Sequence, residues 1–390
     1  MADKICSSSH PLLPPTSEDE RVSWLRLLRS RRVGISTFYR LLRDYGSAKA
    51  AVDALPSIAR KAGVENYAAC EEAHVLKEMD MAARFGACLL FRGEKDFPIR
   101  LTDLSDCPPS NWAKGDISLL QKTTIAMVGA RNASSLGLRM TRRLAGDLGE
   151  AGIVTVSGLA RGIDTMVHKA SIKTGTISVL AAGLDVVYPN ENTDLAESIS
   201  KRGVILSEHA FGQKPLARHF PVRNRLVAGL SNALVVVEAA RKSGSLITAQ
   251  CALDLGREVC AVPGHPFDVR SAGCNILLRD GATLVRSADD ILEVLKASTL
   301  NLREGNPKQT AESGEDDQKI GSSHKAPRRL QDMAQLHGEI LKLLSVVAMP
   351  EDQLIRDLKR SPADTAASVV QLELEGKVIR QPGGMIAKLC

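Results

Sequence analysis

The sequence predicts an α/β protein built on a doubly wound parallel sheet, because two patterns recur between residues 86 and 296. Short apolar runs alternate there with helical stretches, and each run is apolar throughout, as in strands whose two faces are both covered by helices. Ligands of such folds bind outside the carboxyl ends of the strands. The expected strands are Thr124–Val128, Ile153–Ser157, Thr176–Leu180, Val204–Ser207, Ala233–Glu238 and Glu258–Val262.

The segments before this core have a different composition. Residues 1–20 are rich in Ser and Pro and are expected to form a flexible arm. Residues 21–85 carry apolar residues at helical spacing, and between two of these helices Gly34 can turn the chain while Ser36 can cap the helix that follows. These features predict a small helical domain of the helix-hairpin-helix or SAM-like kind.

The segments after the core predict a linker and a second small domain. Residues 297–329 mix both charges with Gly, Ser, Pro and Gln, which indicates a disordered linker. Residues 330–390 contain three helical stretches followed by a hairpin around Gln381–Gly384, the element order of a winged helix. The third stretch, Ser361–Glu375, has no Lys or Arg, so we expect it to contact a protein or to pack. A transcription regulator that reads DNA with this helix is therefore disfavoured.

Composition narrows the remaining possibilities. The formal net charge of +6 and the isoelectric point near 8.9 permit an acidic partner but do not identify nucleic acid. The cysteines form no CxxC pair and no cluster with His at zinc spacing, so we expect reduced thiols and no metal site. We find no secretion signal and no uncharged apolar stretch of membrane-spanning length, so we expect a cytoplasmic protein without a membrane partner.

Two blocks rich in glycine and arginine follow the first two expected strands. In the first, Gly129 lets a ligand approach the backbone and Arg131 offers a guanidinium to a phosphate, although an ordinary structural turn is the alternative. The second block, Ser157–Asp164, offers a nest of N–H groups and the charge of Arg161; the alternative is that Asp164 caps a helix and no ligand binds. The candidate binding residues of these blocks are Gly129, Arg131, Ser157, Gly158, Arg161 and Gly162.

Two further blocks extend the pattern. Phe220–Arg225 is expected to form a loop that presents two guanidinium groups around an amide beside an aromatic ring, which suits a phosphate or a base. A solvated charged face is the alternative. Lys242–Ser245 opens a helix and can point N–H groups at an anion, or can serve only as a helix cap. The candidate binding residues here are Phe220, Arg223, Asn224, Arg225, Lys242, Ser243, Gly244 and Ser245.

Together and in this order, the blocks resemble the DprA/Smf family, the DNA-processing proteins of natural transformation. The resemblance runs from about residue 129 to residue 295 and also rests on Tyr188-Pro189, Val262-Pro263-Gly264 and Gly273-Cys274-Asn275. It implies that a Rossmann-like core, residues 86–296, binds single-stranded DNA through the candidate residues of the four blocks. It further implies a homodimer that protects incoming DNA and helps to load the RecA recombinase during natural transformation and recombination, with no cofactor and no enzymatic activity.

An enzyme on a related fold is the alternative from another class. Phosphoribohydrolases of the lysine-decarboxylase-like group carry a P-G-G-x-G-T-x-x-E block whose glutamate assists cleavage of a nucleoside monophosphate. Thr248 stands near the position of that glutamate in this chain. Asp164, His168, Asp185 and Glu208 do not form a recognisable set of nucleophile and base, so we expect no catalytic residue.

Overall fold

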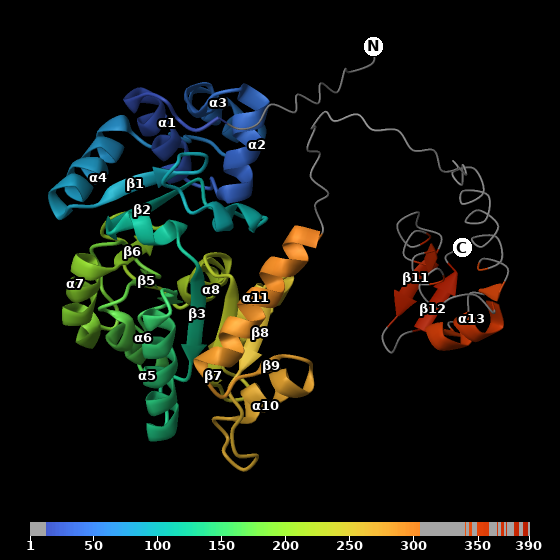
Figure 1. Cartoon of the computed structure of the whole chain (residues 1–390). Coiled ribbons are helices and arrows are strands. Elements are labelled where there is room, and N and C mark those ends of the chain that lie inside the picture. Colours follow the sequence, from blue (N-terminus) through green and yellow to red (C-terminus); the bar gives the residue numbers. More distant parts are fainter. Residues whose placement is uncertain are drawn as a thin grey trace, which may run out of the picture. The chain divides into compact units, whose positions relative to one another are not determined.

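The chain has 390 residues, and the computed structural model describes residues 13–304, with side chains up to residue 297, and parts of the stretch 340–388. The chain divides into two compact units, Met1–Pro307 and Lys308–Cys390 (Figure 1). Most of the expected linker, 305–329, and the first twelve residues of the expected arm lie outside the described residues. The first helix already starts at Glu18, inside the segment expected to be a flexible arm. The last helix of the first unit ends at Glu304, inside the segment expected to be a disordered linker.

The first unit begins with a layer of helices, α1 (Glu18–Arg29), α2 (Ile35–Tyr45), α3 (Ala48–Lys61) and α4 (Glu72–Phe85). Ser17 starts α1, since its Oγ accepts the N–H of Glu20 at 3.3 Å. The expected cap at Ser36 is wrong: Gly34 occupies the N-cap position of α2 and Ser36 lies inside the helix. Gly46 ends α2 in the left-handed conformation, φ 74°, which glycine adopts without strain. The helical domain that the sequence predicts is therefore confirmed.

A nine-stranded sheet follows, in the order β1-β2-β6-β5-β4-β3-β7-β8-β9. The strands from β3 to β9 are parallel, as the sequence predicts, whereas β1 pairs with β2 and β2 with β6 in antiparallel fashion. The sequence did not predict β1, β2 or β9. The bounds are β1 Cys88–Phe91, β2 Ser110–Gly115, β3 Thr124–Gly129, β4 Val154–Ser157, β5 Thr176–Val179, β6 Val204–Ser207, β7 Ala233–Glu238, β8 Glu258–Ala261 and β9 Thr283–Leu284.

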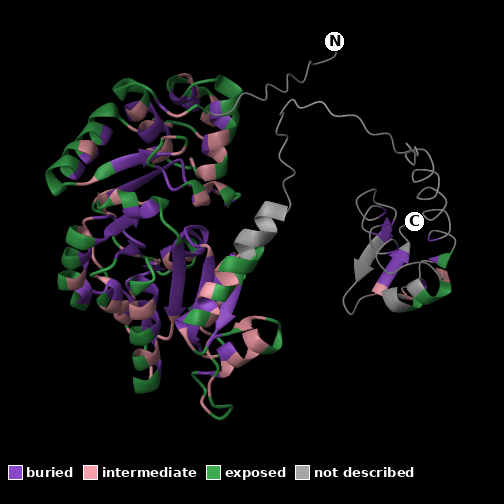
Figure 2. Ribbon diagram, in the orientation of Figure 1, coloured by how far each residue is buried: buried purple, intermediate pink, exposed green. Residues whose placement is uncertain are grey.

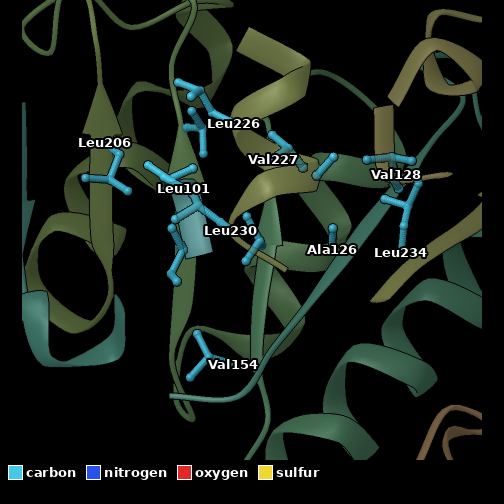
Figure 3. Close-up of a cluster of buried hydrophobic side chains, with 14 of the residues drawn as sticks. Leu101, Ala126, Val128, Val154, Leu206, Leu226, Val227, Leu230 and Leu234 are labelled. Carbon is cyan, nitrogen blue, oxygen red and sulfur yellow. The ribbon is translucent and has the colours of Figure 1, made fainter. Parts of the chain in front are cut away.

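Helices cover both faces of the sheet, because the side chains of each strand alternate between two cores. In β3, Ala126 and Val128 point into a core with α8, α9 and α10, while Ile125 and Met127 point into a core with α5, α6 and α11. Figure 3 shows the first core, where Leu226 and Val227 of α8 lie among residues of the strands. The bounds are α5 Ser135–Glu150, α6 Ile163–Ser171, α7 Thr193–Arg202, α8 His219–Gly229, α9 Gly244–Asp254, α10 Ala272–Arg279 and α11 Ala288–Glu304.

The helical layer and the sheet share one hydrophobic core. The ring of Trp24 in α1 lies 5.2 Å from Phe38 of α2 and 5.7 Å from Phe91 of β1, measured between centroids, and all three side chains are buried. Figure 2 shows the strands of the first unit largely in purple, the colour of buried residues. A buried carboxylate also links the two layers: Glu78 of α4 accepts hydrogen bonds from Arg29 of α1, at 2.8 and 2.9 Å, and from the indole N–H of Trp112 in β2, at 2.8 Å. Burial opposes ionisation of Glu78, but the bonds and charge of Arg29 outweigh it and hold the pKa of Glu78 below its usual value.

The second unit contains a small antiparallel sheet in the order β10-β12-β11. β11 (Val378–Gln381) and β12 (Met385–Lys388) form the hairpin that the sequence predicts, and β10 (Met349–Pro350) precedes α13 (Glu351–Leu358). Leu354, Val369 and Ile386 contribute to its core. Much of the expected helix Ser361–Glu375 lies outside the described residues.

Candidate functional site

The order of the strands creates a crevice beside β3. The chain runs from β3 through β4, β5 and β6 on one side and then returns to the other side of β3 through β7, β8 and β9. Loops leave the carboxyl ends of β3 and β7 in opposite directions, and ligands of such sheets bind at this switch point. A groove of about 850 Å³ lies there, lined by the loop after β3, the loop after β7 and the first turns of α8 and α9. We call it the switch-point groove.

The charge of the switch-point groove is positive. Arg131, Lys242 and Arg270 line it with solvent-exposed side chains. Among the described residues that line it, Asp164 is the one carboxylate, and it is buried. A polyanion entering this groove therefore meets exposed cations and no exposed carboxylate of the lining.

Backbone N–H groups add to this charge, since α8 and α9 both begin at the switch-point groove. Ser243 caps α9, and its Oγ accepts the N–H of Ser245 at 3.3 Å. The space beside Gly244 is open, because a Cβ placed there would meet no atom within 4 Å. The first turn of a helix favours anions, so the expected anion site at Ser243 and Gly244 has suitable geometry.

An aromatic pair lies in the wall of the switch-point groove. The rings of Tyr188 and Phe220 are 5.6 Å apart between centroids and meet edge to face, and the guanidinium of Arg131 lies 5.3 Å from the centroid of Phe220. A cavity of about 340 Å³ beside them is also lined by Arg161. Tyr188 was missing from the candidate residues of the sequence, although Tyr188-Pro189 belongs to the recurring motifs. The sequence signal that could have found Tyr188 is an aromatic residue directly before a proline, outside the expected strands.

The glycines of the first two blocks allow elements to approach closely. A Cβ at Gly129 would lie 2.5 Å from Cγ1 of Ile163, so this glycine lets α6 pack against the end of β3. Gly162 has φ 75° and precedes α6, and a Cβ there would overlap the carbonyl oxygen of Ala130. Ser157 is buried, and its Oγ donates to the carbonyl of Met127 at 2.7 Å. It does not line the switch-point groove, so the expectation that Ser157 faces a ligand is wrong.

The expected loop at Phe220–Arg225 is also wrong, because these residues belong to the helix α8. Arg223 is buried, and its guanidinium donates to the carbonyl groups of Gly158 and Val179. Burial lowers the pKa of Arg223 to about 10, opposed by Asp164 and assisted by Arg131. The guanidinium that the sequence assigned to a ligand thus ties α8 to the ends of β4 and β5.

Arg225 is buried as well. Its Nη2 lies 2.6 Å from Oε2 of Glu208, and its Nε lies 2.8 Å from Oδ2 of Asp106. Arg225 therefore links segments of the core. It does not line the switch-point groove, so the expectation that it contacts a ligand there is wrong. Asn224 remains at the switch-point groove, where its Nδ2 lies 3.5 Å from the carbonyl oxygen of Gly244.

The remaining candidate residues differ in their exposure and in the partners of their side chains. Arg161 is largely exposed and pairs with Glu191 at 2.7 Å. Ser245 is buried, and its Oγ donates to the carbonyl of Gly129 at 2.9 Å, which fixes α9 to the end of β3. Asp164 accepts the N–H of Ala160 at 3.2 Å from within α6, whereas Gly162 occupies the N-cap position, so the capping alternative for Asp164 is not what the structure shows.

The side chains considered for catalysis lie apart from the switch-point groove, with the exception of Asp164. His168 is fully buried, bonds to Thr176 at 2.8 Å, and has its pKa lowered to about 3 by burial and by the charge of Arg223. Asp185 accepts the N–H of Gly212, and Glu208 pairs with Arg225. Among the described residues, His, Cys, Asp and Glu form no group of three that could hold a metal ion. In that same part of the chain, every helix is too short or too polar to cross a membrane.

The fold and the groove define a class: an α/β protein of the Rossmann-like kind with a basic, aromatic-flanked groove at its switch point. The chain belongs to the family described as DNA recombination-mediator protein A, whose model matches residues 88–296. Models for the DprA-like N-terminal HHH domain and the DprA winged helix domain match residues 18–81 and 324–384. The family resemblance seen in the sequence is thereby confirmed.

Individual relatives agree with this assignment. The DNA processing protein DprA of Bacillus subtilis is 46% identical over 204 residues, which make up 52% of this chain and 69% of that protein. The X-ray structure of DNA processing protein A from Streptococcus pneumoniae covers 70% of this chain and 97% of its own, with a TM-score of 0.60 and 32% identity. The DNA processing protein A of Helicobacter pylori, described for its single-stranded DNA binding mode, covers 54% of this chain and 96% of its own, with a TM-score of 0.50 and 29% identity.

Proposed function

We propose that the switch-point groove binds the sugar-phosphate backbone of single-stranded DNA. The observation that carries this proposal is the combination of exposed cations, Arg131, Lys242 and Arg270, with the aromatic pair of Tyr188 and Phe220 in one groove. Proteins that hold single strands without sequence preference combine a basic groove with aromatic rings on which bases stack. The Helicobacter pylori relative, whose description names single-stranded DNA, supports the same assignment.

Binding would proceed through phosphate contacts and stacking. Arg131 and Lys242 offer charge to phosphates, and the first turn of α9 at Ser243 and Gly244 offers N–H groups. Phe220 and Tyr188 offer ring faces to bases, and any base has such a face. Recognition by this groove is therefore independent of sequence and depends strongly on salt.

We infer that this chain takes part in DNA processing during natural transformation in the cytoplasm, where it protects incoming single strands and helps to load the RecA recombinase as a homodimer. Membership of the recombination-mediator family supports this role. The domain boundaries proposed with it are 21–85 for the helical domain, 86–296 for the core and 330–390 for the winged helix, and the family matches at 18–81, 88–296 and 324–384 support them.

We propose that the protein acts without catalysis. An enzyme that cleaves nucleoside monophosphates needs a carboxylate or another base at the substrate. Asp164 is the one carboxylate among the described residues of the groove lining, and it is buried against Arg223. Release of a free base from nucleoside monophosphates by the purified protein would favour the enzyme alternative.

The test is fluorescence anisotropy with labelled single-stranded and double-stranded oligonucleotides over a series of salt concentrations. We expect the double variant Arg131→Ala/Lys242→Ala to weaken binding to all single-stranded sequences alike and to reduce the salt slope by roughly 0.7 for each lost phosphate contact. The control Arg60→Ala/Lys61→Ala removes the same charge from α3. Equal affinity of the two double variants would contradict the proposal.

A further inference from the structure

A loop at the carboxyl edge of the sheet carries the most exposed large apolar side chain of the described part of the chain. The loop, residues 262–271, connects β8 to α10, and Phe267 and Val269 in it are 92% and 74% exposed. The ring of His265 lies 5.6 Å from the ring of Phe267 between centroids. Arg270 follows in the same loop, where its guanidinium pairs with Asp268 at 3.2 Å and stays 45% exposed, so the loop presents an exposed ring and a cation.

This loop forms part of the walls of two grooves. Arg270 lines the switch-point groove. Pro263, Gly264 and His265 line a second groove of about 630 Å³, whose opposite wall is the first half of α5. We call this second hollow the α5 groove. A polymer that leaves the switch-point groove on the side of Arg270 reaches the α5 groove by passing over the loop.

The α5 groove is also basic. Arg139 and Arg142 line it with exposed side chains. Arg143 also lines it, and its Nε lies 3.6 Å from Oδ2 of Asp147. Its carboxylates already have partners: Glu238 accepts the N–H of Ser134 at 2.8 Å, and Asp268 accepts the N–H of Arg270 at 3.0 Å and pairs with its guanidinium at 3.2 Å. Among the described residues of the two linings, the exposed cations without such a partner are Arg131 and Lys242 in the switch-point groove and Arg139 and Arg142 in the α5 groove, so both sides of the loop offer positive charge to a ligand.

We propose that a single strand bound in the switch-point groove continues over this loop into the α5 groove, and that Phe267 stacks on a base at the crossing. This inference rests on the proposed function and extends the site by a second stacking position and a second basic groove. A nucleic acid strand fits better than a protein partner, because the grooves on both sides of the loop are lined by exposed cations, Arg131 and Lys242 in one and Arg139 and Arg142 in the other.

The fluorescence of a tryptophan in place of Phe267 reports directly on stacking between this side chain and a DNA base. Trp24 and Trp112, the two tryptophans of the sequence, are 5% and 3% exposed in the core that the helical layer shares with the sheet. We expect oligo(dT) to quench the fluorescence of the variant Phe267→Trp at saturation. The control Leu76→Trp places the ring on α4, at a residue that is 48% exposed, and should show no added quenching. Absence of quenching in Phe267→Trp overturns the stacking position.

Oligonucleotide length separates the two grooves. We expect Phe267→Ala to weaken binding of an oligonucleotide of about 16 nucleotides by fivefold or more, and to leave one of about 4 nucleotides nearly unchanged. The double variant Arg139→Ala/Arg142→Ala should flatten the salt slope for the longer oligonucleotide alone. Unchanged binding of the longer oligonucleotide by both variants overturns the inference.

The same experiment distinguishes this inference from the proposed function. If Arg131→Ala/Lys242→Ala loses affinity at both lengths while Phe267→Ala loses none, the switch-point groove stands and the extension fails. If none of these variants changes binding at either length, the proposed function itself fails. A change in the sedimentation of the protein alone on Phe267→Ala, with unchanged DNA affinity, would assign the loop to protein association and overturn the inference.

Discussion

Arg225 joins three segments of the core through a single guanidinium. It leaves α8 and reaches Glu208 after β6 and Asp106 before β2, while its own side chain is 9% exposed and that of Glu208 is 10% exposed. A buried ion pair contributes little net stability compared with apolar residues, but the loss of one partner leaves a buried charge without compensation. Mutation of such a residue should therefore change the stability of the fold more than it changes ligand binding.

We predict that Arg225→Ala lowers the free energy of unfolding by about 3–5 kcal/mol. Chemical denaturation followed by circular dichroism measures this change, with Arg241→Ala, an exposed neighbour of the switch-point groove, as the control. The fraction of Arg225→Ala that remains folded should bind single-stranded DNA with nearly the wild-type affinity. Wild-type stability combined with lost DNA binding would restore Arg225 to the binding site.

His168 gives the core a dependence on pH. Burial and Arg223 depress its pKa from 6.5 to about 3, so the unfolded chain takes up a proton below pH 6.5 that the folded chain does not. The free energy of unfolding should therefore fall as the pH is lowered from 6.5 towards 3, by up to about 1.4 kcal/mol per unit from this residue. Denaturant titrations at several pH values measure it. His168→Gln should show a flatter dependence, and an equal slope in both proteins would refute the assignment.

At the scale of single elements, α8 shows why sequence patterns misplace residues. Pro221 and the clustered charges suggested a loop, but Pro221 lies in the first turn of α8, where a helix needs no N–H donor. Arg223 and Arg225 carry the charge expected of a surface, yet their partners are carbonyls and carboxylates from distant segments of the chain. A charge run by itself does not say whether its partners are solvent or protein.

The junction after β4 provides a prediction at this scale. A Cβ at Gly158 would overlap the guanidinium of Arg223, whereas a Cβ at Gly244 would meet no atom within 4 Å. We predict that Gly158→Ala lowers the free energy of unfolding by about 1–3 kcal/mol, because Arg223 must shift from its carbonyl partners. Gly244→Ala is the matched control and should stay within about 0.5 kcal/mol of the wild type. Thermal and chemical unfolding of both variants test the difference.

At the scale of the whole molecule, the sequence predicted the parallel strands β3 to β8 and the helical and winged-helix flanks. It missed β1 and β2, because these strands pair in antiparallel fashion with no α-helix in the described residues between them, and Ser110–Gly115 contains polar residues instead of a continuous apolar run. The candidate site was predicted as a set of blocks, and the fold brings their exposed members, Arg131 and Lys242, to one groove. Which members are buried depends on contacts between segments far apart in the chain, and no local pattern records those contacts.

The division into two compact units leads to a prediction about truncation. Deleting residues 331–390 should leave most of the affinity for single-stranded DNA intact, because the switch-point groove is formed within the first unit. Deleting residues 1–85 should instead yield an aggregating protein, since it uncovers Phe91 and Trp112. Anisotropy and sedimentation of the two truncated proteins check these outcomes. Strong loss of DNA binding in the first deletion would contradict the prediction.

The contact of Trp24 with Phe91 also bears on how the protein can change over generations. These rings belong to segments that separate family models match, residues 18–81 and 88–296, yet they pack in one core. Protein interiors are close-packed, so a larger or smaller side chain on one side requires a compensating change on the other. Side chains that meet between the helical layer and the sheet are therefore expected to change together. If the helical layer of one member were replaced by that of a distant member, the side chains of the sheet that pack against it would have to be replaced too.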